Sequence, residues 1–434
     1  MLLLFDVVSK IISLAIFFFG IIHIIKTNNK NNVAIFWAGY MVGSEVLFRM
    51  TGGTILYELP KYSVLLFLIL GLYVEKKRHH LSVSYVIYIL LLLIGIAFTD
   101  IPFTESIRKA VAFNLSGPIL LGVSAIYFYK RKLSLEVVLN LLFVIVLPII
   151  SMLSLLYLKT PDFTDIVFRS NANFATSGGY GPNQVSTILG FGVFIFLVHL
   201  VLKKRITVAI LLDIGFFIYL IYRGLLTFSR GGMLTALLAI LAFSFFYIFS
   251  VKDKFNQLIK YTGIVALFGI VLVSYTSYKT DGMLINRYTN KNSLGMEKKD
   301  ISTGRITLFV TEFEAFLDNP FFGIGVGGAK YYRQDKLDKR AASHNEVSRL
   351  LSEHGMIGVL VLILLLLIPA RHILSQSFLP MAFLSAFLVF WFLTINHSAM
   401  RIAFPSFVYG LSVMIITFNN EKEQDEEEEI AKIT

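Results

Sequence analysis

Long apolar runs separated by short polar segments dominate this chain of 434 residues. Most runs have roughly 17 to 24 residues, and a helix that rises about 1.5 Å per residue then crosses a hydrocarbon core about 30 Å thick; the run 62–74 is shorter, which fits a tilted or partly interfacial helix. The pattern predicts transmembrane helices near residues 2–25, 33–50, 62–74, 81–98, 110–129, 135–158, 184–202, 206–222, 232–250, 258–278, 355–370, 378–396 and 403–418. We therefore expect an all-α polytopic membrane protein with about thirteen transmembrane helices, in a range of roughly 12–14.

Basic residues concentrate in alternate loops, which have the sequences KTNNKNN, EKKRHH, KRKLS, KKR and VKDKF. By the positive-inside rule these loops face the cytoplasm. The other loops then face outward, and they are 159–183, 223–231, 279–354 and 397–402. The loop 279–354 is much the largest, and we expect it to carry short helices on the extracytoplasmic side.

The predicted organisation has three parts. N-terminal transmembrane helices occupy 1–160, a second membrane domain that includes the large loop occupies 161–418, and an acidic tail occupies 419–434. The tail is expected to be solvated and disordered on the cytoplasmic side. The first apolar segment has no basic region before it, which predicts a retained helix rather than a cleaved signal peptide.

The composition excludes several classes of function. Hydrophobic residues make up 56% of the chain and the mean hydropathy is +0.73, above the balance of a soluble globular protein. Cysteine is absent, so the chain has no disulfide, no thiolate metal site and no cysteine nucleophile. The formal net charge of +11 comes mostly from the short loops that set topology, so we do not expect nucleic-acid binding.

The large outward loop contains a predicted helix over 302–320, with Thr303 as its N-cap and Pro320 at its end. Arg305 then lies in the first turn, near the lipid headgroups. Apolar residues recur at helical spacing with acidic residues between them, which predicts that the helix lies on the membrane surface. These apolar residues are Ile306, Phe309, Phe313 and Phe316.

Four glycines follow in FFGIGVGGAK, residues 321–330. Their backbone N–H groups can surround a phosphate, and an equally good interpretation is a tight turn that returns the chain to the bilayer. No strand or βαβ unit surrounds the segment, so a dinucleotide-binding fold is excluded.

The segment RAASHNEVSRLLSEHGMIG is a polar helix in a largely apolar chain. Ser343 and Glu346 have the spacing of a capping box, which makes His344 the first helical residue. The positive end of the helix dipole disfavours an imidazolium there, so His344 is predicted to be neutral and able to accept a proton. Arg349 is spaced to pair with Glu346 and Glu353. The alternative is that the histidine and glutamates only decorate a solvated helix end.

Two further outward segments carry candidate binding groups. In YRGLLTFSRGG, Ser229 is placed to cap the next helix, and Arg230 lies in its first turn. The alternative there is an arginine that meets lipid headgroups, with glycines for close helix packing. In FRSNANFATSGGYGPNQVSTILG, the groups with binding potential are Arg169, Asn183 and Gln184.

The last outward loop adds His397 and Arg401. Glu45 and Arg49 stand one turn apart in the second span, and we predict that they pair with each other for a structural purpose.

The outward groups together suit a polyanionic lipid headgroup such as a diphosphate, which arginines bind well. The set comprises Arg169, Arg230, Arg305, Arg401, His344 and Glu353. No acidic cluster for a divalent metal stands in these loops, so an enzyme here needs arginines to stabilise a diphosphate leaving group. We expect no metal site and no cofactor.

Three sequence blocks resemble, in order and spacing, the O-antigen ligase and O-antigen polymerase superfamily. They are TFSRGG (227–232), GRITLFVTEFEAFLDNPFFGIGVGG (304–328) and SHNEVSRLLSEHGMIG (343–358). The third block has the family's pattern of His-Asn, nine residues, then Gly-x-x-Gly, here His344, Asn345, Gly355 and Gly358. The two glycines also mark where the polar helix turns into the next span. The resemblance covers roughly residues 165–415.

The resemblance implies a glycan transferase at the periplasmic or outer face of the bacterial cytoplasmic membrane. Its donor is a saccharide on undecaprenyl diphosphate, and its chemistry needs no metal, ATP or nucleotide sugar. His344 is the implied general base, and Arg230 and Arg305 hold and stabilise the leaving diphosphate. The implied substrate-binding residues are Arg169, Asn183, Gln184, Ser229, Asn345, Glu353 and Arg401.

The competing interpretations as a glycan transferase differ in the acceptor. A ligase moves a finished glycan onto lipid A-core or a similar acceptor, a close variant moves it onto a protein hydroxyl, and a polymerase moves it onto a growing glycan. Membrane lipids and other proteins of envelope polysaccharide assembly are the further partners implied. A lipid-linked glycan transporter is the alternative of another class, and it needs ionisable residues deep in the spans. Asp213 is the clearest mid-span charge, and the other polar groups cluster at one face.

Overall fold

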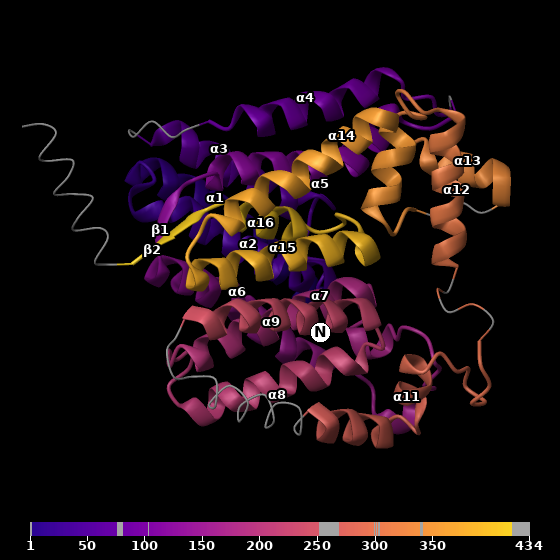
Figure 1. Ribbon diagram of the computed structural model, residues 1–434. Helices are drawn as coiled ribbons and strands as arrows, with labels where there is room; N and C mark the ends of the chain where they lie inside the picture. Colours follow the sequence, from indigo (N-terminus) through magenta and orange to yellow (C-terminus); the bar gives the residue numbers. More distant parts are fainter. Residues whose placement is uncertain are drawn as a thin grey trace, which may run out of the picture.

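The long apolar runs form the helices of a bundle in a computed structural model (Figure 1), which describes residues 2–75, 81–102, 104–250, 269–298, 300, 302, 304–338 and 342–418. Among these described residues, eight helices are long and apolar enough to cross a membrane. The elements in chain order are α1 (Leu2–Thr27), η1 (Lys30–Asn32), α2 (Val33–Met50), α3 (Leu59–Val74), α4 (Val83–Ala97), α5 (Ile107–Phe128), β1 (Lys132–Ser134), α6 (Leu135–Lys159), η2 (Phe163–Asp165), η3 (Ala175–Ser177), α7 (Pro182–Val201), α8 (Ile210–Leu226), α9 (Arg230–Ser250), α11 (Met283–Tyr288), α12 (Arg305–Asp318), α13 (Ala329–Leu337), α14 (Glu346–Leu374), α15 (Phe378–Ser398), α16 (Ala403–Leu411) and β2 (Ile415–Thr417). This architecture confirms the all-α polytopic membrane fold, while the predicted span near 258–278 lies largely outside the described residues.

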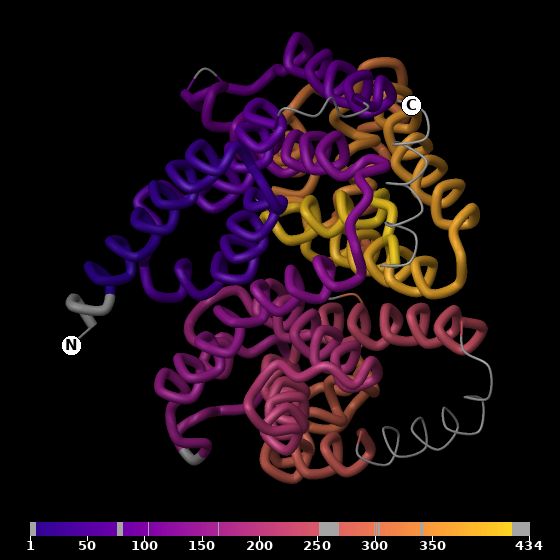
Figure 2. Tube along the Cα trace, turned by 90° about the vertical axis from the view of Figure 1, so that its left-hand side faces the viewer, coloured from indigo at the N-terminus to yellow at the C-terminus, as the bar shows by residue number. Residues whose placement is uncertain are grey.

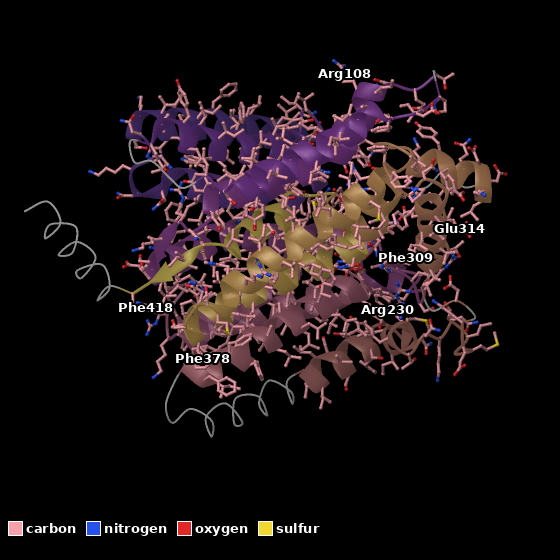
Figure 3. All side chains as sticks on the ribbon, turned by 45° about the horizontal axis from the view of Figure 1, so that its top comes forward. Arg108, Arg230, Phe309, Glu314, Phe378 and Phe418 are labelled. Carbon is pink, nitrogen blue, oxygen red and sulfur yellow. The ribbon has the colours of Figure 1, made fainter. Side chains whose placement is uncertain are left out.

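The loops sort to two ends of the bundle, as the alternation of basic loops predicts. At the end that carries α12, Thr176 donates to the carbonyl of Leu226 and Arg401 donates to the carbonyl of Ser343. At the end that carries the two strands, Arg131 forms an ion pair with Glu75 at 2.7 Å. We call these the α12 end and the strand end. Figure 3 shows Phe309 and Glu314 of α12 at one end and Phe418 at the other.

The last predicted span, 403–418, is not a single helix. α16 has nine residues, about 13.5 Å at 1.5 Å per residue, and the chain continues through a turn into β2, which pairs in parallel with β1. Figures 1 and 2 both show α16 inside the bundle, and its residues are buried on all sides. α16 alone is too short to join the two ends of the bundle, and the extended residues of β2 complete the crossing.

Polar groups on other helices bond to this half-helix at its start and along its length. The Glu45 carboxylate accepts the backbone N–H of Ala403 at 2.6 Å, and Ser406 donates to the carbonyl of Gly117. Broken helices are tolerated at membrane depth where protein surrounds them in this way. The predicted pairing of Glu45 with Arg49 is also confirmed, at 2.6 Å.

Asp213, the clearest mid-span charge in the sequence, lies in the first turn of α8 rather than in the middle of a span. Its two carboxylate oxygens accept the backbone N–H groups of Ile206 and Thr207, at 3.1 and 2.8 Å. The carboxylate therefore closes the loop before α8, because its partners are the otherwise unpaired donors of that loop.

Candidate active site

A polar cavity of about 110 Å³ lies at the α12 end of the bundle. Its lining comes from α7, α9, α11 and the start of α12, and comprises Asn183, Arg230, Gly231, Arg287, Ser302 and Arg305. Figure 3 shows Arg230 toward this end of the molecule. Three of the six lining residues are arginines and none of the six is acidic, so the cavity suits an anion.

Close helix packing places Arg230 at the cavity. A Cβ atom on Gly231 would lie 2.6 Å from the ring of His397 on α15, and one on Gly232 would lie 2.2 Å from Oγ of Ser186 on α7. Only glycine permits these approaches, so the packing interpretation of the two glycines is correct. The same packing holds the start of α9 against α7.

A hydrogen bond joins α7 to the segment before α9. Ser229 donates its hydroxyl to Oδ1 of Asn183 at 2.8 Å, and Ser229 itself is buried. Asn183 lines the cavity, whereas Ser229 supports it from behind. The structure therefore brings Asn183 and Arg230 together, as the sequence interpretation requires.

Arg287 is a cavity residue that the sequence interpretation missed. It lies on the short helix α11, is 8% exposed, and donates to the backbone carbonyls of Phe228 and Ser170. Burial, followed by the charges of Arg230 and Arg305, lowers the pKa of Arg287. Its only sequence signal is a basic residue in the large outward loop, which does not distinguish it from its neighbours.

Arg305 begins α12, with Gly304 at the N-cap position in a left-handed conformation of φ 82°. The predicted N-cap Thr303 lies outside the described residues. Burial lowers the pKa of Arg305, and the charges of Arg230 and Arg401 lower it further. The arginines thus lie close enough to repel one another, and a bound dianion would relieve that repulsion.

His344 stands just before α14, not in its first turn. Asn345 is the N-cap, because its side-chain oxygen accepts the N–H groups of Val347 and Ser348 at 2.8 and 3.3 Å. The predicted capping box with Ser343 as N-cap is therefore wrong. Asn345 has an extended backbone that suits a cap, and the Ser343 hydroxyl instead bonds to the backbone of Asn345.

Burial and neighbouring cations keep His344 neutral. Burial, then the charges of Arg401, Arg305 and Arg333, and finally that of His397, lower the pKa of His344 to about 4. The expected neutral state is thus supported, but its cause is not the helix dipole. The Nδ1 atom of His344 is buried and has no hydrogen-bond partner among the described residues.

Arg401 holds the backbone next to this histidine. It donates to the carbonyl of Ser343 at 2.9 Å, and burial lowers its pKa. It lies outside the cavity of the three arginines and lines a second, smaller cavity instead. Its place beside His344 suggests a positioning role.

Glu353 lies outside both cavities. It is buried within α14 and forms an ion pair with Arg349 at 3.1 Å, and Arg349 also pairs with Glu346. Both pairings follow from helical spacing, so those predictions are confirmed. α14 runs on from the polar segment into the membrane, with a break at Gly355, where φ is 59°, as predicted.

Two other predicted binding residues are not part of the cavity lining. Arg169 is exposed in the loop before α7. Gln184 is buried in the first turns of α7, beside Gly181. The structure brings neither of them to the arginines that line the cavity.

The glycine segment between α12 and α13 is a packed turn. The N–H of Ile324 donates to the carbonyl of Ser352, and the N–H of Val326 donates to the carbonyl of Gly95. Gly323, Gly325 and Gly327 all have positive φ. The N–H groups of Gly323 and Gly328 also donate to backbone carbonyls, so the structure favours the interpretation as a turn.

α12 stands crosswise to the long helices in Figure 1 and carries Arg305 at its start. Ile306, Phe309 and Phe313 are exposed, in keeping with a helix on the membrane surface. The other face of α12 contacts α13, because Glu312 is 1% exposed and pairs with Arg333 of α13.

The same carboxylate accepts a hydrogen bond from Ser348 of α14. Glu312 therefore links α12, which begins with Arg305, to α14, which follows His344.

Among the described residues, no group of three or more histidines and acids is placed to hold a metal ion. The arrangement can bind an anion on three arginines next to a neutral imidazole that accepts a proton. The apolar helices and the arginine cavity together define an integral membrane protein with a site suited to an anion.

Residues 215–363 match the family model described as O-antigen ligase. The matched range contains all three sequence blocks, with Arg230, Arg287, Arg305 and His344, although it is shorter than the resemblance noted above. The match covers about a third of the chain, and it supports the resemblance to the O-antigen ligase and O-antigen polymerase superfamily and an enzyme of glycan transfer. No curated protein matches the chain in sequence.

Proposed function

We propose that this protein transfers a saccharide from undecaprenyl diphosphate to an acceptor hydroxyl at the extracytoplasmic face of the bacterial cytoplasmic membrane. The observation that carries the proposal is the cavity of three arginines near a half-buried, neutral histidine. The family match supports glycan transfer, and the ligase type, with lipid A-core or a similar glycan as acceptor, is the function we favour.

The reaction divides between these groups. His344 takes the proton from the acceptor hydroxyl as its oxygen bonds to the anomeric carbon of the donor sugar. The bond between that carbon and the diphosphate oxygen breaks, and undecaprenyl diphosphate leaves with the bonding electrons. Arg230, Arg287 and Arg305 stabilise the charge that develops on this leaving group, so we propose that the step requires no metal ion.

The proposal is tested with purified protein in lipid nanodiscs and a labelled undecaprenyl-diphosphate oligosaccharide. A single shifted product that forms only when lipid A-core is added indicates a ligase, whereas a ladder from the donor alone indicates a polymerase. His344→Ala should abolish either product. His23→Ala is the matched control, because His23 is an exposed histidine near the strand end of α1.

A transporter is the competing class, and it predicts no product from the wild-type protein or from either variant. Asp213 does not favour a transporter, because its carboxylate closes the loop before α8. If His344→Ala formed product at the wild-type rate, His344 would not be the general base.

A further inference from the structure

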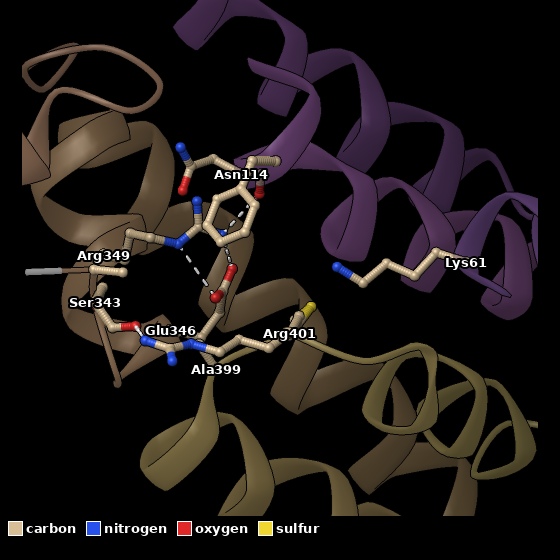
Figure 4. Close-up of a pocket in the computed structure, with 10 residues that line it drawn as sticks. Lys61, Asn114, Ser343, Glu346, Arg349, Ala399 and Arg401 are labelled. Carbon is tan, nitrogen blue, oxygen red and sulfur yellow. Dashed lines mark hydrogen bonds and ion pairs between the residues drawn. The ribbon is translucent and has the colours of Figure 1, made fainter. Parts of the chain in front are cut away.

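A second cavity, of about 30 Å³, borders the segment that contains His344, because Ser343 is one of its lining residues. It is formed by α3, α5, α14 and the loop after α15, with Lys61, Phe113, Asn114, Ala342, Ser343, Glu346, Arg349, Ala399, Met400 and Arg401 as its lining. In Figure 4, Arg401 meets Ser343 on one side of this cavity and Lys61 points toward it from the other. Nothing in the mechanism above uses this cavity.

His344 has neighbours in both cavities. Ser343 lines the second cavity and directly precedes His344 in the chain. Arg401 lines the second cavity and Arg305 lines the first, and both are charged neighbours of the same imidazole. The imidazole thus has a charged neighbour in each cavity, and a transfer between two substrates requires both substrates close to one base.

The two cavities differ in charge. In the first, three arginines have no acidic residue among the lining groups. In the second, Lys61 pairs with Glu58 at 2.8 Å, and Arg349 pairs with Glu346 and Glu353. Two of its three cations, Lys61 and Arg349, are thus paired with carboxylates, so a phosphate has less to gain there than in the first cavity. Hydroxyl groups can exchange hydrogen bonds with these polar side chains.

The lining also offers an apolar surface. Phe113 is 45% exposed at this site, and Met400 lies beside it in the lining. An exposed aromatic ring packs against the apolar C–H face of a sugar, while the polar groups meet its hydroxyls. A volume of this size has room for one or two water-sized groups, such as a hydroxyl or hydroxymethyl.

Backbone strain is concentrated at the same place. Ala399 has φ 52° and ψ −161°, a combination that is found almost entirely in glycine. Strain of this kind clusters at ligand-binding sites, where the surrounding structure holds the backbone in place.

From these observations we infer that the second cavity is part of the acceptor subsite, and that it takes a hydroxyl or hydroxymethyl group of the acceptor's uncharged terminal sugar. The inference rests on the proposed transfer reaction and adds its second substrate site. Lys61, Phe113 and Asn114 lie outside the range 215–363 that matches the family. The N-terminal helices of this chain therefore contribute to the choice of acceptor.

Phe113→Ala tests the subsite through steady-state kinetics in nanodiscs, with lipid A-core and the lipid-linked donor each varied in turn. The KM for the acceptor should rise about 2- to 10-fold, from the loss of one aromatic contact. The KM for the donor and the slow transfer of its glycan to water should not change. Phe113→Trp should restore the wild-type KM, and Phe309→Ala is the control, because Phe309 is a similarly exposed ring, at 40%, on α12.

A direct binding measurement separates this inference from the proposed function. The probes are the core oligosaccharide released from lipid A-core and the oligosaccharide released from the donor, titrated without donor lipid. Binding that Phe113→Ala weakens, in a protein that shows no transfer, would contradict the proposed function and retain the glycan site. Failure of both probes to bind the wild-type protein, or a rise in the donor KM equal to that for the acceptor, would overturn the subsite.

Discussion

The acid limb of the pH profile tests how the structure prepares His344 for catalysis. A solvated histidine has its ordinary pKa near 6.5, and burial followed by the charge of Arg401 and then of Arg305 lowers that of His344 to about 4. At pH 5.5 a group with a pKa of 4 is about 97% neutral, whereas one with a pKa of 6.5 is about 9% neutral. The kcat/KM for the donor should therefore be nearly the same at pH 5.5 as at pH 7, and fall only near pH 4.

Donor binding should shift the acid limb of the pH profile to higher pH. The negative diphosphate offsets the arginine charges that disfavour an imidazolium, so the pKa of His344 rises in the complex. Because kcat/KM follows the free enzyme and kcat follows the enzyme–substrate complex, the acid limb of kcat should lie at higher pH than that of kcat/KM.

The assay is the initial rate of transfer at donor concentrations below and above KM, between about pH 4 and pH 8. Arg401→Gln removes one of the cations next to His344, so its kcat/KM limb should move to higher pH. Arg371→Gln is the matched control, since Arg371 is in the last turn of α14, toward the strand end. A wild-type limb near pH 6.5 that Arg401→Gln leaves in place would refute the reasoning.

Three other substitutions test the site and its supports. Arg287→Ala removes one of three cavity arginines, so the donor KM should rise about 10-fold or more, and an unchanged KM would show that Arg287 does not bind the donor. Glu312→Leu leaves Arg333 buried without its ion pair, which should cost about 3–5 kcal/mol and lower the thermal unfolding temperature, and Glu312→Leu with Arg333→Met should recover part of it. Gly231→Val places carbon 2.6 Å from the ring of His397, so thermal stability and transfer should both fall, and wild-type values in both assays would contradict the packing argument.

Local features of this protein follow from the sequence alone. The lengths of the apolar runs predict a helical membrane bundle, because backbone groups in a bilayer must pair within their own segment. Alternating basic loops predict which loops share an end, and the contacts at the α12 end and the strand end agree. Pairs such as Arg349 with Glu353 depend only on helical spacing.

Features that depend on long-range packing had to come from the tertiary structure. The start of α16 depends on Glu45 of α2, whose carboxylate accepts the N–H of Ala403, and no local pattern encodes that partner. The glycine turn packs against α4 and α14, and Asn345 rather than Ser343 caps α14, although both interpretations were chemically sound.

The candidate site shows the same division. Arg230, Arg305 and His344 stand out in the sequence because polar groups are rare in an apolar chain and follow a family pattern. The sequence does not mark Arg287 or the second cavity. α11 and the N-terminal helices reach the site only through the packing of distant segments. Sequence spacing determines which side chains share a helix face, whereas the approach of different helices depends on which residues allow close contact, as Gly231 does against His397.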